Sequence, residues 1–239
     1  MKRQVIDAVV KARADKRPLA LVTNLKSGAQ SIVTNAEITG DLALDGATVG
    51  AAREALRHNR SGSIKAGDGA LFVHVFNPPL RLVIVGAVHI AQALAPIAAL
   101  AGYDVTVIDP RGAFATEARF PGVTLTDEWP DDAMKRLAPD ARTAVVTLTH
   151  DPKLDDPALQ IALRSEAFYI GSLGSKKTHA SRLQRLTEAG FTPAEMARIH
   201  GPIGLPLGGR APAEIAIAVM AQVIQALHAA PAGAAAVAA

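Results

Sequence analysis

The feature that most constrains the fold is the stretch from Leu82 to Tyr103, which contains no Asp, Glu, Lys or Arg. Its length is close to what a membrane-spanning helix requires. However, Gly86 divides it into a β-branched run and an alanine-rich segment whose apolar residues have helical spacing. A second β-branched run, DVTVID, follows directly. The pattern favours a buried βαβ unit over a membrane span, because strands of parallel sheets are apolar on both faces.

Strands and helices continue to alternate after this unit. GVTLTD is a candidate short strand, and RTAVVTLT and AFYIG are strand-like. Helices are expected from about Asp156 to Arg164, over Lys176–Ala189, and from Pro212 to about Leu227. Such alternation is typical of an α/β protein with a parallel sheet and right-handed crossovers. We therefore predict a Rossmann-type, doubly wound parallel sheet.

The residues before Asn77 are organised differently. An amphipathic helix with Val5, Val9 and Ala12 facing inward precedes the strand-like segments PLALVTNL and QSIVTNAEITGDLAL. A helix over Asp45–His58 and a hairpin turning at Asp68-Gly69 complete a ββαββ pattern. Two prolines after Asn77 end strand pairing. We expect a small α+β domain over 1–78, a Rossmann-type domain over 79–228 and a disordered tail over 229–239.

Composition excludes several classes of chemistry. The 239 residues carry a net charge of only +3 and include no cysteine. Disulfides, thiolate metal sites and a cysteine nucleophile are therefore excluded, and there is no broad basic surface for nucleic acid. The N-terminal apolar run is interrupted by Asp7 and Lys11, unlike a secretory signal. We expect a cytoplasmic protein that contacts neither membrane nor nucleic acid. We also expect a homodimer, because homodimers are the commonest soluble oligomers.

The segment between the first strand and helix of the βαβ unit resembles a dinucleotide-binding turn. Gly86 is suited to the tight turn, Ala91 to close helix–strand packing, and Asp109, which ends the next strand, to a ribose hydroxyl. Val88 stands where a second glycine normally lets the backbone approach a pyrophosphate, and a β-branched side chain there resists the φ values of glycine. The alternative is a Rossmann core that has lost its nucleotide site.

The residues around that turn complete the predicted nucleotide site. Ala87, Val88 and His89 would line it together with Gly86 and Asp109. Arg111 either pairs with a 2′-phosphate or another anionic group, or is a surface arginine.

Two further loops follow predicted strands at the carboxyl edge of the sheet, where open α/β sheets bind ligands. His150 and Asp151 are candidate catalytic residues, as acid and base, as an orienting pair or as hard metal ligands. In the alternative, an aspartate there only caps the next helix, which we favour for Asp155.

The second loop contains Gly171, Gly174, Ser175 and Lys176, and leads into a helix. Glycines, a hydroxyl and a lysine at a helix N-terminus suit phosphate or pyrophosphate, although a plain capped helix gives the same pattern.

From about Leu71 to Leu227 the sequence resembles the xanthine dehydrogenase accessory factor family (XdhC/CoxI-like). The resemblance rests on LFVHVFNPPLRLVIVGAVHIAQAL, VTVIDPRGAFATEARFP, AVVTLTHDPKLDDPAL, FYIGSLGSKKTHASRL and ARIHGPIGLPLGGRAPAEIAIAV, taken jointly and in order. It implies a chaperone, rather than an enzyme, for molybdenum hydroxylases such as xanthine dehydrogenase or carbon monoxide dehydrogenase. Such a protein would bind molybdenum cofactor, as molybdopterin or its cytosine dinucleotide form. It would assist sulfuration by a cysteine desulfurase and insertion into the apo-hydroxylase.

Two other functions are compatible with the residues alone. One is an NAD(P)-dependent oxidoreductase, in which Asp109 would hold the ribose and His150 would donate a proton. The other is a regulatory module that binds a nucleotide and contacts partners through its N-terminal domain. No metal ligands are assigned in any of these hypotheses.

Overall fold

The computed structural model describes residues 3–66 and 69–229, which form two compact units divided between Pro78 and Pro79. The predicted Asp68-Gly69 turn and the predicted tail fall largely outside the described residues. The N-terminal unit contains α1 (Arg3–Ala14), β1 (Leu19–Asn24), β2 (Gln30–Val33), β3 (Ile38–Gly40), α2 (Gly46–Arg57), β4 (Gly62–Ala66) and β5 (Gly69–Phe76). These strands form an antiparallel sheet in the order β3-β2-β1-β5-β4.

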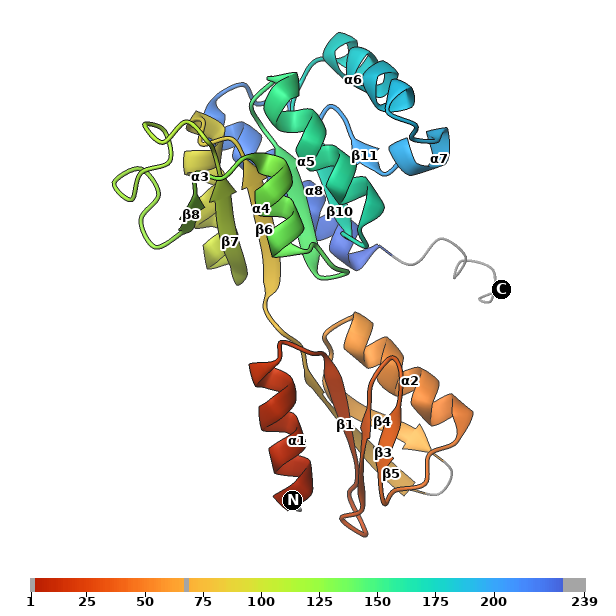
Figure 1. Cartoon of the computed structure of the whole chain (residues 1–239). Helices are drawn as coiled ribbons and strands as arrows, with labels where there is room; N and C mark the ends of the chain where they lie inside the picture. The colour runs from red at the N-terminus through yellow and green to blue at the C-terminus, as the bar shows by residue number, and fades with distance from the viewer. Residues whose placement is uncertain (1–2, 67–68, 230–239) are drawn as a thin grey trace. The chain divides into compact units, whose positions relative to one another are not determined.

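Helices cover the two faces of this sheet (Figure 1). Alternation along β1 directs Leu19 and Leu21 into a core with α1, and Ala20 and Val22 into a separate core with α2. The predicted inward residues of α1 (Val5, Val9 and Ala12) are buried.

The predicted ββαββ pattern is wrong in one respect, because the second strand-like segment forms two strands. The Oγ1 atom of Thr34 accepts hydrogen bonds from the backbone N–H groups of Ala36 and Glu37 and closes a turn between β2 and β3. Serine and threonine hydroxyls favour such turns over continued strand pairing.

The C-terminal unit contains a six-stranded parallel sheet in the order β11-β10-β9-β6-β7-β8. The elements in chain order are β6 (Leu80–Val85), α3 (His89–Leu100), β7 (Tyr103–Ile108), β8 (Thr124–Thr126), α4 (Pro130–Leu137), β9 (Thr143–Thr147), α5 (Pro152–Arg164), β10 (Tyr169–Ser172), α6 (Lys176–Glu188), α7 (Pro193–Met196), β11 (Ile199–His200) and α8 (Pro212–His228). The predicted α/β class and doubly wound parallel sheet are confirmed.

Both faces of the parallel sheet are covered by helices (Figure 1). Leu82 and Ile84 of β6 belong to a core with α3 and α8, whereas Val83 and Val85 belong to a core with α4 and α5. This burial on both faces explains why the last four residues of β6, Leu82–Val85, carry no charge. None of the helices in the described ranges is long and apolar enough to cross a membrane.

Candidate functional site

The predicted site loops follow four neighbouring strands at one edge of the sheet. The last residues of β6, β7, β9 and β10 are in register, since Val85 pairs with both Ile108 and Thr147, and Thr147 pairs with Ser172. Because the strands are parallel, the loops that leave them emerge side by side.

The turn after β6 requires a glycine for two reasons. Gly86 has a φ of +107°, and a Cβ there would overlap the Cγ2 atom of Thr149, which follows β9. A side chain would therefore meet both an unfavourable backbone conformation and the neighbouring loop. The missing side chain of Gly86 thus allows the β9 loop to approach the β6 loop closely.

Val88 and its neighbours occupy ordinary conformations in this turn. Val88 is the N-cap of α3 with φ −89° and ψ 174°, an extended backbone that any residue adopts. Val88 thus avoids the φ values that only glycine adopts readily, and its side chain occupies space beside the turn. Ala87 and Ala91 are fully buried, and His89 is the first residue of α3.

Asp109 and Arg111 bind each other. Arg111 donates from Nε to Oδ1 of Asp109 at 2.8 Å and from Nη2 to Oδ2 at 2.7 Å. The backbone N–H groups of Arg111 and Ala87 donate to the same two oxygens, at 3.0 and 2.8 Å. The prediction assigned Asp109 to a ribose hydroxyl and left Arg111 as either a partner of an anionic group or a surface arginine; the structure pairs the two residues, and the Arg111 side chain is partly exposed.

This pairing decides the charge state of Asp109. Complete burial of the side chain by itself raises the pKa of the carboxyl, but the hydrogen bonds from Arg111 and Ala87 outweigh burial, and the net pKa lies below its usual value. The carboxylate accepts four hydrogen bonds, which is about the capacity of its two oxygens.

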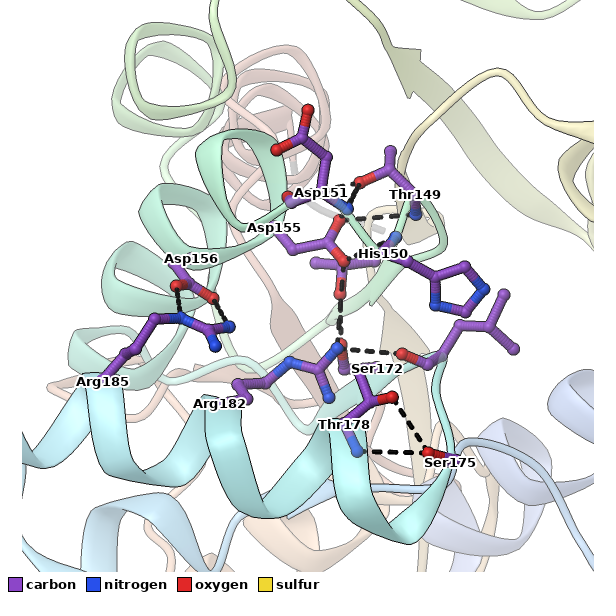
Figure 2. Close-up of polar contacts among 12 residues, drawn as sticks. Thr149, His150, Asp151, Asp155, Asp156, Ser172, Ser175, Thr178, Arg182 and Arg185 are labelled. Carbon is purple, nitrogen blue, oxygen red and sulfur yellow. Dashed lines mark hydrogen bonds and ion pairs between the residues drawn. The ribbon is translucent and has the colours of Figure 1, made fainter.

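The loop after β9 is organised around Asp155. The Oδ1 atom of Asp155 accepts from the Thr149 hydroxyl at 2.6 Å, and Oδ2 accepts from the His150 backbone N–H at 3.1 Å (Figure 2). His150 has a φ of +65°, an uncommon conformation for a residue other than glycine, and its side chain is exposed.

The helix after this loop begins earlier than predicted. Asp151 is the N-cap of α5, since its side chain accepts from the Lys153 backbone N–H at 2.9 Å, and Pro152 is the first helical residue. The prediction that Asp155 caps the helix is therefore wrong. Asp155 is buried in the first turn, and burial raises the pKa of its carboxyl.

Two glycines shape the end of β10 and the loop after it, and Gly171, which was expected in the loop, lies within the strand. Gly171 is buried, and a Cβ there would meet the side chains of Ile203 and Tyr169. Gly174 has a φ of +145° and lies against Thr178. Ser175 is the N-cap of α6, where its hydroxyl accepts from the Thr178 backbone N–H at 3.1 Å, and Lys176 is exposed. The loop thus combines the capped helix and the exposed lysine that the sequence indicated.

Arg182 of α6 links the β9 and β10 loops, and the sequence reasoning missed it. Its Nη2 donates to the Leu173 carbonyl oxygen at 2.8 Å and lies 3.9 Å from Oδ2 of Asp155 (Figure 2). A signal was available, because Arg182 lies four residues before the buried Leu186 and so falls on the apolar stripe of α6. Contacts therefore connect all four predicted loops.

Among residues 3–66 and 69–229 there is no group of three His, Asp or Glu side chains placed to hold a metal ion. His150 and Asp151 do not belong to such a group.

The match to a known family lies in the same C-terminal unit. The model of the XdhC Rossmann domain matches residues 82–223. The chain belongs to this family. It is 35% identical over 148 residues to the Escherichia coli molybdenum cofactor insertion chaperone PaoD, covering 62% of this chain and 40% of that protein. It is 31% identical over 156 residues to a Bacillus subtilis protein named as a probable xanthine dehydrogenase component, covering 65% of this chain and 45% of that one. The chain thus spans less than half the length of these relatives.

A solved structure extends the likeness to the fold of most of the chain. A Bacillus halodurans protein described as a xanthine dehydrogenase matches with a TM-score of 0.68 at 24% identity, covering 94% of this chain and 64% of that one. At this identity the match bears on the fold alone.

Proposed function

We propose that this XdhC-family protein binds the molybdenum cofactor and assists its insertion into an apo molybdenum hydroxylase, such as xanthine dehydrogenase, in the cytoplasm. The observation that carries the proposal is a series of contacts between the loops at Gly86, Asp109, Thr149 and Gly174. These loops lie at one edge of the sheet, in the domain that matches the family model. The name of the relative PaoD supports the cofactor and the insertion step.

The residues present fit a phosphorylated pterin better than a dinucleotide. In the β10 loop, Gly174, Ser175 and Lys176 lie at a helix N-terminus and suit a phosphate group. In the β6 loop, Val88 fills the position of the second glycine, and Asp109 has no free acceptor for a ribose hydroxyl. We therefore favour molybdopterin over its cytosine dinucleotide form.

The chain's own residues would position the cofactor rather than transform it. Gly171, Gly174, Ser175 and Lys176 would hold the phosphate, while the Gly86–His89 turn would lie beside the pterin. His150 would contribute a polar side chain from the neighbouring loop. Because the chain has no cysteine, we assign the sulfur-carrying thiol of a sulfuration step to a cysteine desulfurase partner. The molybdenum centre would supply the redox chemistry once it is in the hydroxylase.

Cofactor retention and transfer test this proposal directly. The purified protein is mixed with molybdenum cofactor released from a donor enzyme, separated by size, and assayed for bound pterin by fluorescence and for molybdenum by mass spectrometry. The loaded fraction is then added to apo-hydroxylase. We expect retained pterin, a gain of hydroxylase activity, and a loss of both in a Lys176→Gln variant. Failure of the wild-type protein to retain pterin or to activate the hydroxylase contradicts the proposal.

The NAD(P)-dependent oxidoreductase hypothesis is not favoured by the geometry, because the Asp109 carboxylate that would hold the ribose already accepts four hydrogen bonds from protein donors. We expect calorimetry with millimolar NAD(H) or NADP(H) to detect no binding to the wild-type protein. We also propose that the protein is a homodimer. Light scattering of the protein as it elutes from a size-exclusion column tests this separately.

A further inference from the structure

A cavity lies between the N-terminal end of α5 and the side of α6 that faces it. It has a volume of about 250 Å³ and is lined by His150, Lys177, Thr178, Ser181, Arg182 and Arg185, among others. This volume is below the range of roughly 300–1,000 Å³ that is usual for pockets holding drug-sized ligands. The cavity therefore suits one chemical group of a ligand better than an entire nucleotide.

The charges around the cavity are mainly positive. Three cationic side chains line it, against a single carboxylate, that of Asp155. Arg185 is neutralised by Asp156, with Nε and Oδ2 2.5 Å apart. The Lys177 amine has no ion-pair or hydrogen-bond partner within the described ranges. Two helices also begin beside the cavity, so the positive ends of both helix dipoles lie close to it.

The buried and incompletely hydrogen-bonded side chain of Arg182 points to a ligand. Its side chain is only 2% exposed. Its Nε and Nη1 atoms are buried and have no hydrogen-bond acceptor among the residues that the structure describes. Asp155, at 3.9 Å, is at the limit of an ion pair. Leaving buried guanidinium donors unsatisfied is costly, and a planar guanidinium offers paired donors that match phosphate oxygens.

We infer that this cavity binds a phosphate group, with Lys177 and Arg182 as the principal cations and the hydroxyls of Thr178 and Ser181 as further hydrogen-bond donors. Burial lowers the pKa of Arg182, which means that the protein around it disfavours its charge. A bound dianion would offset that effect. The inference goes beyond the proposed function, because it concerns a second phosphate site beside α5, separate from the one proposed at Gly174, Ser175 and Lys176.

Inorganic phosphate is the probe that tests the cavity. Binding to the full chain is measured by calorimetry and by ³¹P NMR, with chloride adjusted to keep the ionic strength constant. We expect the wild-type protein to bind phosphate. We expect Lys177→Gln to weaken binding several-fold, and Arg182→Lys to weaken it by roughly tenfold or more, because hydrogen bonds to a charged group are lost.

Lys153→Gln is the matched control, since it removes one exposed charge from the first turn of α5 without altering the lining of the cavity. It is expected to bind phosphate like the wild-type protein. If Arg182→Lys fails to fold, as judged by circular dichroism, the comparison of phosphate affinity between Lys177→Gln and Lys153→Gln remains decisive. No binding at tens of millimolar phosphate, or equal losses in those two variants, overturns the inference.

A second arm distinguishes the source of the phosphate. Displacement of bound phosphate by a simple phosphomonoester supports a phosphorylated organic ligand, and a site that retains phosphate supports the free anion. Because inorganic phosphate is the probe, a failure here leaves the cofactor-transfer assay to judge the proposed function independently.

Discussion

At the scale of single residues, backbone conformation separates positions that look alike in the sequence. Gly86 and Val88 both lie in the turn after β6, but only Gly86 has a positive φ and a neighbouring loop where its side chain would be. The substitution of a second glycine by valine therefore costs the backbone nothing. What it changes is the space and the hydrogen-bonding surface offered to a ligand.

Gly86→Ala is expected to destabilise the C-terminal unit by about 2–4 kcal/mol, combining backbone strain with overpacking against Thr149. Gly102→Ala is the control, because Gly102 also has a positive φ but nothing lies near its missing Cβ. It should cost about 1 kcal/mol. Urea unfolding followed by the fluorescence of Trp129 measures both. Equal losses would show that the contact with Thr149 contributes nothing.

Asp109 is expected to make stability depend on pH. Its pKa in the folded protein lies below the ordinary value of 3.8, so its ionised form stabilises the fold above that value. The contribution is lost as the pH falls through the lowered pKa. Compared with Asp109→Asn, the wild-type protein should be more stable by about 1.5–3 kcal/mol at neutral pH.

That difference should shrink in acid, as measured by urea unfolding at a series of pH values. Asp155, whose pKa burial raises, has the opposite pH dependence, but it is present in both proteins and cancels in the comparison. A difference that stays constant down to about pH 2, below the ordinary pKa of an aspartate, would contradict a role for the charge of Asp109.

At the scale of elements, the start of α5 shows how one aspartate can be mistaken for another. Three aspartates lie at this boundary, at positions 151, 155 and 156. The first of them caps the helix, Asp155 organises the β9 loop, and Asp156 pairs with Arg185. Caps and buried loop anchors use the same side chain, so the sequence pattern alone does not separate them.

Two substitutions of Asp151 distinguish capping from acid–base chemistry. Asp151→Ala should lower stability by about 1 kcal/mol, because the N-cap acceptor is lost. Asp151→Asn keeps the acceptor and should retain both stability and cofactor transfer. Thermal unfolding and the transfer assay measure the two effects. Loss of transfer in the asparagine variant, with stability unchanged, would instead support a catalytic carboxyl group.

At the scale of the whole molecule, each unit contains its own hydrophobic core. The clusters of the N-terminal unit lie between Val5 and Phe76, and those of the C-terminal unit lie between Leu80 and Ala226. A separate core is the physical requirement for independent folding.

We therefore expect a fragment comprising residues 79–229 to fold without the N-terminal unit. Its urea midpoint, followed by Trp129 fluorescence, should match the transition of the same unit in the full chain. Circular dichroism provides the check on secondary structure. A fragment that lacks helical signal would show that the C-terminal core depends on the first 78 residues.

The sequence by itself determined the order of the main strands and helices in the C-terminal unit, the glycine turn at Gly86 and the family, because these depend on local periodicity, φ preferences and ordered motifs. Short elements such as α4 and β11 went unpredicted, since a few residues carry little periodicity. Only the tertiary structure decided that the Ala87 backbone binds Asp109 and that Arg182 lies buried beside Asp155. Those contacts join residues on different loops and elements, and they depend on how parallel strands bring these segments together.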